Sequence, residues 1–207
     1  MRMDGKIKKL QQRTPSLLGI EQFAKFAILL PLIKKEKETH LLFEVRSLQL
    51  RRQPGEICFP GGKVDHDDEN EQAAAIRETC EELGIEKDAI HDVFPLDYMV
   101  SPFGMVLYPF VATLASPRLI KPNESEVDEI FTVPLSFFYE TQPEIYHVQL
   151  QACPDADFPF DKIPGGKNYR WRPRQIDEYF YYYEDKVIWG LTAKIVHHFI
   201  ELLRSTE

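Results

Sequence analysis

Three carboxylates crowd into little more than one helical turn in the segment RETCEELG, residues 77–84. Glu81 and Glu82 follow Glu78 by three and four residues, a spacing at which like charges on an exposed helix cost about 0.2–0.5 kcal/mol per pair. A helix with a merely solvated acidic face tends to carry lysine at i+4 positions, and this segment does not. Converging carboxylate oxygens suit Mg²⁺ or Mn²⁺, which take oxygen ligands and keep several waters. The spacing therefore favours a divalent metal site over a solvated acidic face.

These carboxylates need a helix and a neighbouring turn to position them. The pattern predicts a helix over residues 69–83 that ends at Gly84. The expected buried stripe of this helix comprises Ala73, Ile76, Cys80 and Leu83. The three glutamates are expected on the opposite side, with Arg77 on the flank. The glycine pair Gly61–Gly62 precedes the helix and can bring bare backbone amides close to a ligand.

Composition indicates one soluble domain. The 207 residues, 43% of them hydrophobic and 12% aromatic, predict a single domain over 1–207 with its core at about 24–204. A net charge of −8 argues against a broad nucleic-acid footprint but is compatible with a small anionic ligand. Three cysteines without CxxC spacing favour a reducing, cytoplasmic setting. The longest apolar run, 26–33, is too short to span a bilayer, so no membrane partner is expected.

A mixed sheet with one early and one late helix is expected from the periodicity. Residues 26–33 and 40–46 are predicted to form a hairpin, and the segment 93–100 is predicted to pair with 107–114. Further expected elements are a short strand before FPGG, a strand in 131–138 that breaks into a turn or helix, strands in 146–152 and 178–184, and a closing helix over 191–203. Residues 152–177 are predicted to form an irregular, basic stretch.

The segment GGKVDHDDENEQAAAIRETCEELGI, residues 61–85, resembles the Nudix box, whose pattern is G-x5-E-x7-R-E-U-x-E-E-x-G-U with U a bulky aliphatic residue. The match departs from the pattern at two places. Thr79 stands where an aliphatic residue is usual, and one extra residue separates Gly62 from Arg77. The first acidic position of the box is therefore filled by either Asp68 or Glu69.

A second signature lies upstream of the box. Residues 46–62 read R-S-x3-R-x3-G-x3-F-P-G-G, which resembles the element beside the box in the coenzyme A pyrophosphatases of the Nudix superfamily. Segments 124–135 and 187–195 are similar to later parts of the same subfamily, so the resemblance runs from about residue 26 to about 200. It implies an α/β Nudix fold, in which a mixed β-sheet is sandwiched between helices.

The resemblance also implies a metal-dependent pyrophosphohydrolase. It would cleave coenzyme A or its thioesters to 4′-phosphopantetheine, or its acyl form, and adenosine 3′,5′-bisphosphate. The expected Mg²⁺ or Mn²⁺ ligands are Glu78 and Glu82, with Glu81 joining directly or through water. Arg77 matches the arginine of the box and could orient one of these carboxylates. These four residues are the expected catalytic group.

The general base and the substrate contacts are less narrowly defined. The superfamily takes its base from the box or from a later loop, and Glu126 and Glu129 are the later-loop candidates. The expected substrate-binding residues are Arg46, Arg51, Gly61 and Gly62, the two arginines meeting the 3′-phosphate. Arg52 lies outside the motif and is expected to be solvated. The basic residues of 162–174 form either a second wall of the site or a solvated loop.

Two other functions stay open at this point. One is a Nudix enzyme for another nucleoside diphosphate derivative, such as ADP-ribose, NADH, a dinucleoside polyphosphate or an oxidised nucleotide. The other is a non-catalytic Nudix domain that binds a nucleotide as a regulator, which the retained carboxylates disfavour. The sequence also leaves a homodimer open. The aromatic run 179–183 is expected to be sheet core and edge, with adenine stacking as the alternative.

Overall fold

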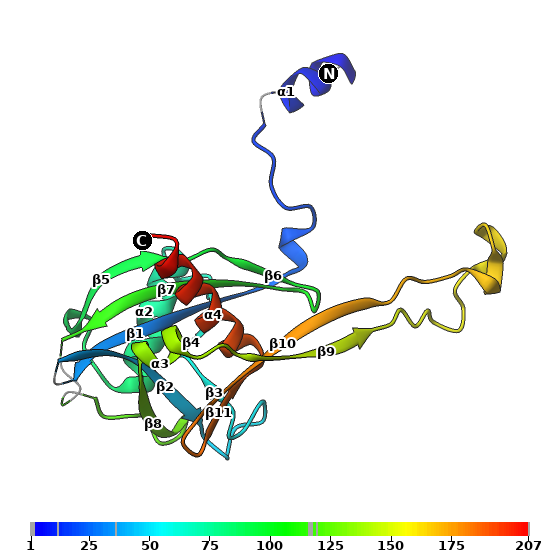
Figure 1. Ribbon diagram of the computed structural model, residues 1–207. Coiled ribbons are helices and arrows are strands. Elements are labelled where there is room, and N and C mark those ends of the chain that lie inside the picture. The colour runs from blue at the N-terminus through cyan, green and yellow to red at the C-terminus, as the bar shows by residue number, and fades with distance from the viewer. Residues whose placement is uncertain (1–2, 12, 36, 116–117, 119, 207) are drawn as a thin grey trace.

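The computed structural model of the protein describes residues 3–11, 13–35, 37–115, 118 and 120–206 (Figure 1). Within this part of the chain, eight strands form a mixed sheet in the order β3-β2-β1-β7-β5, with β4 paired to β1, β6 to β7 and β8 to β2. The strands are β1 (Ala24–Lys35), β2 (Glu38–Arg46), β3 (Ile57–Cys58), β4 (Gly61–Lys63), β5 (Ile90–Pro95), β6 (Met99–Ser101), β7 (Met105–Leu114) and β8 (Val127–Pro134). The predicted mixed-sheet fold class is confirmed.

Helices cover both faces of this sheet. The α-helices are α1 (Met3–Leu10), α2 (Glu71–Leu83), α3 (Leu135–Glu140) and α4 (Gly190–Arg204), and short 3-10 turns occupy Ile20–Gln22, Lys87–Ala89, Phe160–Lys162 and Gly166–Asn168. Figure 1 shows α2 and α4 on opposite sides of the sheet. None of the helices in the described part of the chain combines the length and apolar character that a membrane crossing requires.

Alternation along β2 supplies the sheet with two cores. Leu41 and Phe43 belong to the cluster that packs under α3 and α4, whereas Leu42 belongs to the cluster that packs against α2. Successive strand residues point to opposite faces, so Glu44 is directed to the same side as Leu42, toward α2. β1 and β7 run parallel through the middle of the sheet over nine residue pairs and carry both cores.

The predicted hairpins and helices are largely confirmed. β1 pairs with β2 in antiparallel register, and β5 and β6 both pair with β7. The acidic helix begins at Glu71 rather than residue 69 and ends before Gly84, as expected. The strand predicted in 131–138 is β8, which starts earlier, at Val127, and leads into α3.

The late aromatic strands form a separate sheet rather than part of the main one. β9 (Glu144–Leu150), β10 (Arg174–Tyr183) and β11 (Lys186–Trp189) pair antiparallel in the order β11-β10-β9. Figure 1 shows β9 and β10 extending away from the body as a long arm, with the irregular residues 151–173 at its far end. The basic side chains of 162–174 are exposed on this arm and do not line the site described below, so the solvated-loop interpretation holds.

Candidate active site

Helix α2 is held at both ends by local interactions. The Asn70 side chain caps its first turn by accepting a hydrogen bond of 2.9 Å from the Ala73 amide. Gly84 ends the helix in a left-handed conformation, with φ of 59°. A Cβ atom on Gly84 would also collide with the carbonyl oxygen of Lys121. Only glycine therefore satisfies both the backbone conformation and the close approach at this end.

The buried face of α2 differs from the predicted stripe. Thr79 is fully buried and Glu82 is 4% exposed, whereas Ala73 and Cys80 are only partly buried. The Thr79 hydroxyl, at a position where an aliphatic residue is usual, donates 2.7 Å to the Ala75 carbonyl and so satisfies its own hydrogen bond inside the helix. The expectation that all three glutamates lie on an exposed side is wrong for Glu82, because this carboxylate faces the sheet.

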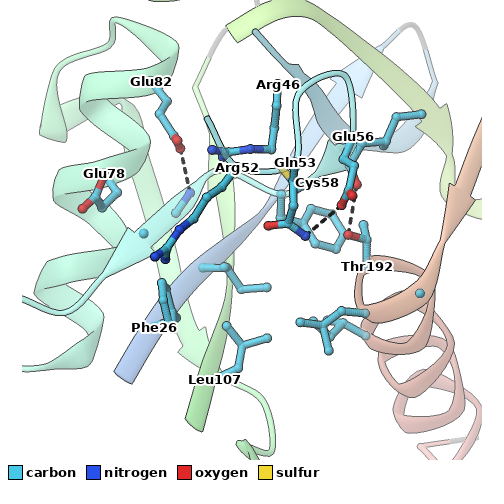
Figure 2. A pocket seen from close by; sticks show the side chains of 18 of the residues that line it. Phe26, Arg46, Arg52, Gln53, Glu56, Cys58, Glu78, Glu82, Leu107 and Thr192 are labelled. Atoms are coloured by element: carbon cyan, nitrogen blue, oxygen red, sulfur yellow. Dashed lines mark hydrogen bonds between the residues drawn. The ribbon is translucent and has the colours of Figure 1, made fainter. Parts of the chain in front are cut away.

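A backbone amide of the glycine turn holds the buried carboxylate. Glu82 Oε2 accepts a hydrogen bond of 2.7 Å from the Gly61 amide, which Figure 2 shows as a dashed line. Gly61 has φ of 148°, and a Cβ atom there would lie 2.6 Å from the Ile28 Cα. A Cβ atom on Gly62 would instead lie 2.6 Å from Glu78 Oε1. The two glycines are therefore required for different reasons, one by backbone of β1 and the other by a carboxylate of α2.

Arg77 ties the helix to the loop that precedes it. Its Nε and Nη2 atoms donate to the two carboxylate oxygens of Asp68 at 2.9 and 3.0 Å, and its Nη1 donates to Glu78 at 2.9 Å and Glu81 at 3.4 Å. The hydrogen bonds from Arg77 hold the pKa of Asp68 below its usual range, and Asp68 in turn raises the pKa of Arg77. Glu69 is exposed. Of the two candidates for the first acidic position of the box, Asp68 is therefore the one that pairs with Arg77, and Glu69 is not.

A carboxylate from the sheet, Glu44 on β2, is only 1% exposed and lies on the side of the sheet that faces α2. Its Oε1 accepts a hydrogen bond of 3.3 Å from the Cys58 thiol, while its Oε2 is buried without a hydrogen-bond partner among the described residues. Burial raises the pKa of Glu44 to about 7. Burial, and next to it the charge of Glu44, raises the pKa of Glu82 to about 9. Sequence reasoning missed Glu44, although one acidic residue inside the apolar strand LLFEV was a usable signal.

Glu78 and Glu81 lie on the outer part of the same cluster. The side chain of Glu78 is 17% exposed and that of Glu81 is 54% exposed. Partial burial raises the pKa of Glu78, against the lowering influence of Arg77. The helix therefore presents a graded series of carboxylates, from Glu82 against the sheet to Glu81 in solvent.

A cavity of about 600 Å³ opens beside these carboxylates (Figure 2). Glu78, Glu82, Gly61 and Gly62 line one end of it. Its other lining residues include Arg46, Arg52, Gln53, Glu56, Cys58, Phe26, Met105, Leu107, Glu126, Glu178, Trp189, Leu191 and Thr192. The cavity thus has an acidic end against α2, cations across its middle, and a mixed apolar and acidic wall near the start of α4.

Only some of the predicted substrate-binding arginines and general-base glutamates line the cavity. Arg46 and Arg52 line the cavity, and Figure 2 shows Arg52 reaching across it toward the α2 carboxylates, whereas Arg51 is exposed and outside the lining. Glu126 lines the cavity, but Glu129 is exposed and accepts a hydrogen bond of 2.7 Å from Lys186. Of each predicted pair, one member therefore reaches the cavity. The structure adds Arg52, which lines the cavity although its side chain is exposed, as expected.

The carboxylates are the type of ligand that a hard divalent cation prefers. Burial, and after it the charge of neighbouring carboxylates that include Glu126, raises the pKa of Glu44, Glu78 and Glu82, and one oxygen of Glu44 is buried without a hydrogen-bond partner among the described residues. Such an oxygen-rich, mutually repelling set matches the ligand preference of Mg²⁺ or Mn²⁺. In the conformation of the described residues, no three acidic, histidine or cysteine side chains are close enough to bind one ion. Binding would draw the carboxylates closer than they lie here.

A mixed sheet, an acidic helix and a glycine turn beside a cavity of about 600 Å³ define an α/β protein with a carboxylate-rich pocket. Residues 25–152 match the model of the NUDIX domain family, and the chain belongs to that family. The predicted family resemblance is confirmed.

Curated relatives extend this assignment. The chain is 39% identical over 134 residues to "Peroxisomal coenzyme A diphosphatase NUDT7" of Mus musculus, covering 65% of this chain and only 56% of that protein. It is 35% identical over 171 residues to "Uncharacterized Nudix hydrolase NudL" of Photorhabdus laumondii, covering 83% of this chain and 80% of that protein. The likeness to a coenzyme A pyrophosphatase subfamily is therefore supported by these relatives.

The fold is shared with a solved structure. The crystal structure of a MutT/nudix family protein from Enterococcus faecalis superposes with a TM-score of 0.54, covering 99% of this chain and 70% of that one. The identity is 12%, so this likeness concerns the fold alone.

Proposed function

We propose that this protein is a pyrophosphohydrolase that cleaves the pyrophosphate bond of coenzyme A or its thioesters with Mg²⁺ or Mn²⁺. The observation that carries the proposal is the α2 carboxylate cluster at one end of the cavity, with Arg46 and Arg52 across its middle. A pyrophosphate is anionic, and a site that combines cations with metal-binding carboxylates can receive it. The curated relative named as a coenzyme A diphosphatase supports coenzyme A as the substrate.

Glu78 and Glu82 are the proposed metal ligands, with Glu81 at their exposed edge. A bound Mg²⁺ or Mn²⁺ would neutralise charge on the pyrophosphate and acidify the attacking water. Arg77 positions Glu78 by its 2.9 Å hydrogen bond and leaves Asp68 to hold the far side of its guanidinium group. Glu82 keeps the glycine turn in place through the Gly61 amide.

Glu126 is the proposed general base. It lines the cavity, and its Oε1 accepts 3.3 Å from the Asn123 side-chain amide, which leaves its other oxygen to take a proton from water. Arg46 and Arg52 are the proposed contacts for the phosphates, including the 3′-phosphate of coenzyme A. The oxygen of water forms a bond to one phosphorus of the pyrophosphate, and the bond from that phosphorus to the bridging oxygen breaks, so that the bridging oxygen leaves with the other phosphate. The products are 4′-phosphopantetheine, or its acyl form, and adenosine 3′,5′-bisphosphate.

A substrate panel tests this proposal. Purified protein is incubated with Mg²⁺ or Mn²⁺ and with coenzyme A, ADP-ribose, NADH, a diadenosine polyphosphate and dNTPs, and the products are separated by chromatography. Coenzyme A is expected to be cleaved with the highest kcat/KM, and EDTA is expected to stop the reaction. Faster cleavage of another substrate would reject coenzyme A, and no cleavage of any compound would favour a nucleotide-binding regulator.

A further inference from the structure

The outer face of the small sheet β9-β10-β11 carries an unusual set of exposed aromatic side chains. Tyr146, Tyr182 and Trp189 are 52%, 49% and 43% exposed, and Phe180 lies among them. Phe180 contacts all three, with ring centroids 5.3 Å from Tyr146, 6.4 Å from Tyr182 and 5.7 Å from Trp189. These four rings are called the aromatic face below. Contiguous exposed apolar surface of this kind marks a binding site more often than isolated apolar residues do.

The strand register explains why these rings share one side. Phe180 pairs with Trp189, and Tyr146 pairs with Glu178, two residues before Phe180. Strand residues two apart point to the same face, so Glu178, Phe180 and Tyr182 project together. The intervening Tyr179, Tyr181 and Tyr183 project to the opposite face, where they pack against the core. The predicted core role of the run 179–183 therefore applies to alternate residues only.

The aromatic face is continuous with the cavity of the proposed active site. Trp189, a member of the aromatic face, also lines the cavity, and so does Glu178, which projects from the same side of β10 as Phe180. A Cβ atom on Gly190 would lie 3.6 Å from Glu178 Oε2, which places this carboxylate beside the start of α4. Trp189 therefore connects the cavity to the other three rings through its contact with Phe180.

The wall where the cavity meets the aromatic face is acidic. Its charged residues are Glu56 and Glu178, and Glu56 accepts a hydrogen bond of 2.8 Å from Gln53. Carboxylates repel phosphate but accept hydrogen bonds from amide N–H groups. The cations that line the cavity are Arg46, Arg52 and Lys63. Lys63 follows Gly62, which approaches Glu78, and Figure 2 shows Arg52 reaching toward the α2 carboxylates. This wall therefore suits a part of a ligand that carries no phosphate.

We infer that the aromatic face binds the acyl chain of a coenzyme A thioester whose pyrophosphate lies at α2. This inference rests on the proposed function and narrows its substrate class to thioesters of medium or longer chain length. An adenine ring would cover a single aromatic side chain, whereas the face extends over several residues at about 3.3 Å per residue. A flexible chain of methylene groups matches that extended shape. The pantetheine amides meet Glu56 and Glu178 on the way.

Binding without turnover tests the inference. Coenzyme A and decanoyl coenzyme A are titrated into the protein in EDTA by isothermal calorimetry, and each fully buried methylene is worth about fourfold in affinity. Because the face covers the chain on one side only, decanoyl coenzyme A is expected to bind about tenfold more tightly than coenzyme A. Equal affinities in the wild-type protein would overturn the inference.

A double variant separates the face from the cavity. Tyr146→Ser with Tyr182→Ser leaves every cavity-lining residue in place and is expected to remove the decanoyl advantage while coenzyme A binds and is cleaved as before. Tyr98→Ser, which alters another exposed tyrosine, serves as the matched control and is expected to keep the advantage. Weaker binding of coenzyme A or of adenosine 3′,5′-bisphosphate by the double variant would assign the face to adenine and overturn the inference.

Two further outcomes distinguish the inference from its neighbours. A change from dimer to monomer in the double variant, measured by sedimentation velocity, would assign the face to a second copy of the chain and overturn the inference. If the wild-type protein binds coenzyme A and decanoyl coenzyme A with the predicted difference but cleaves neither, the proposed function fails while the acyl site stands. If the wild-type protein cleaves coenzyme A but binds decanoyl coenzyme A no more tightly than coenzyme A, the acyl site fails while the proposed function stands.

Discussion

Adjacent glycines that meet different neighbours provide a matched pair of substitutions. In Gly62→Ala, the added Cβ would lie 2.6 and 2.7 Å from the two carboxylate oxygens of Glu78, and no positive φ constrains this residue. The Glu78 side chain is flexible and can rotate away, at a cost of about 0.5–1.5 kcal/mol for an off-rotamer torsion. Restoring ordinary van der Waals contact moves its carboxylate by about 1 Å, and a misplacement of that size can reduce a reaction rate by about 100-fold.

The neighbouring substitution, Gly61→Ala, is expected to reduce stability more than activity. Its Cβ would lie 2.6 Å from the Ile28 Cα and would also collide with the Ala27 carbonyl oxygen, and both are backbone atoms of β1. Its φ of 148° adds backbone strain of about 1–3 kcal/mol, and overpacking adds about 1–3 kcal/mol. We therefore expect the free energy of unfolding to fall by about 2–6 kcal/mol.

Two assays on both variants complete this test. Urea denaturation followed by circular dichroism gives the free energy of unfolding, and chromatographic detection of coenzyme A products gives kcat/KM. Gly62→Ala is expected to lose about 100-fold in kcat/KM with near wild-type stability, and Gly61→Ala to lose stability first. A Gly62→Ala protein with full activity, or with as large a stability loss as Gly61→Ala, would refute the reasoning.

Three further predictions concern single side chains of the site. Arg77→Lys removes the two-atom contact to Asp68 and is expected to lower kcat/KM by about 10–100-fold in steady-state assays, and wild-type rates would contradict the positioning role. Glu126→Gln is expected to slow turnover at saturating coenzyme A by at least about 100-fold, whereas Glu129→Gln, the matched control outside the cavity, is expected to leave it unchanged. The reverse order would transfer the base to Glu129. Thr79→Val keeps the buried volume and is expected to change the free energy of unfolding by less than about 1.5 kcal/mol in urea titrations. A larger loss would show that the hydroxyl has a partner besides its own helix.

The acidic helix could be predicted from sequence because its signals are local. Gly84 and the spacing of Arg77 to Glu82 depend only on residues within one helix and its two ends. The burial of Glu82 could not be predicted in the same way. Periodicity predicts that charged residues lie outside. The hydrogen bond that offsets the cost of burying Glu82 comes from the Gly61 amide, 21 residues earlier in the chain.

The cavity and the arm depend on contacts that periodicity does not encode. Arg51 and Arg52 are neighbours in one loop, and the turn between β2 and β3 decides which of them faces the cavity. The aromatic content of β10 predicted a strand, but its pairing with β9 spans the 23 residues 151–173 between the two strands. Such non-local pairing decides which sheet a strand joins. The choice of Asp68 over Glu69 likewise follows from where the Arg77 side chain reaches.

The most direct test of the central claim is product identification from coenzyme A with the wild-type protein and Glu78→Gln in parallel. With Mg²⁺ or Mn²⁺, mass spectrometry is expected to find 4′-phosphopantetheine and adenosine 3′,5′-bisphosphate in equal amounts from the wild-type protein. The folded Glu78→Gln protein is expected to form them at least about 100-fold more slowly, because it lacks a carboxylate that the metal ion and Arg77 share. Absence of these products from the wild-type reaction, or an undiminished rate in Glu78→Gln, would contradict the account.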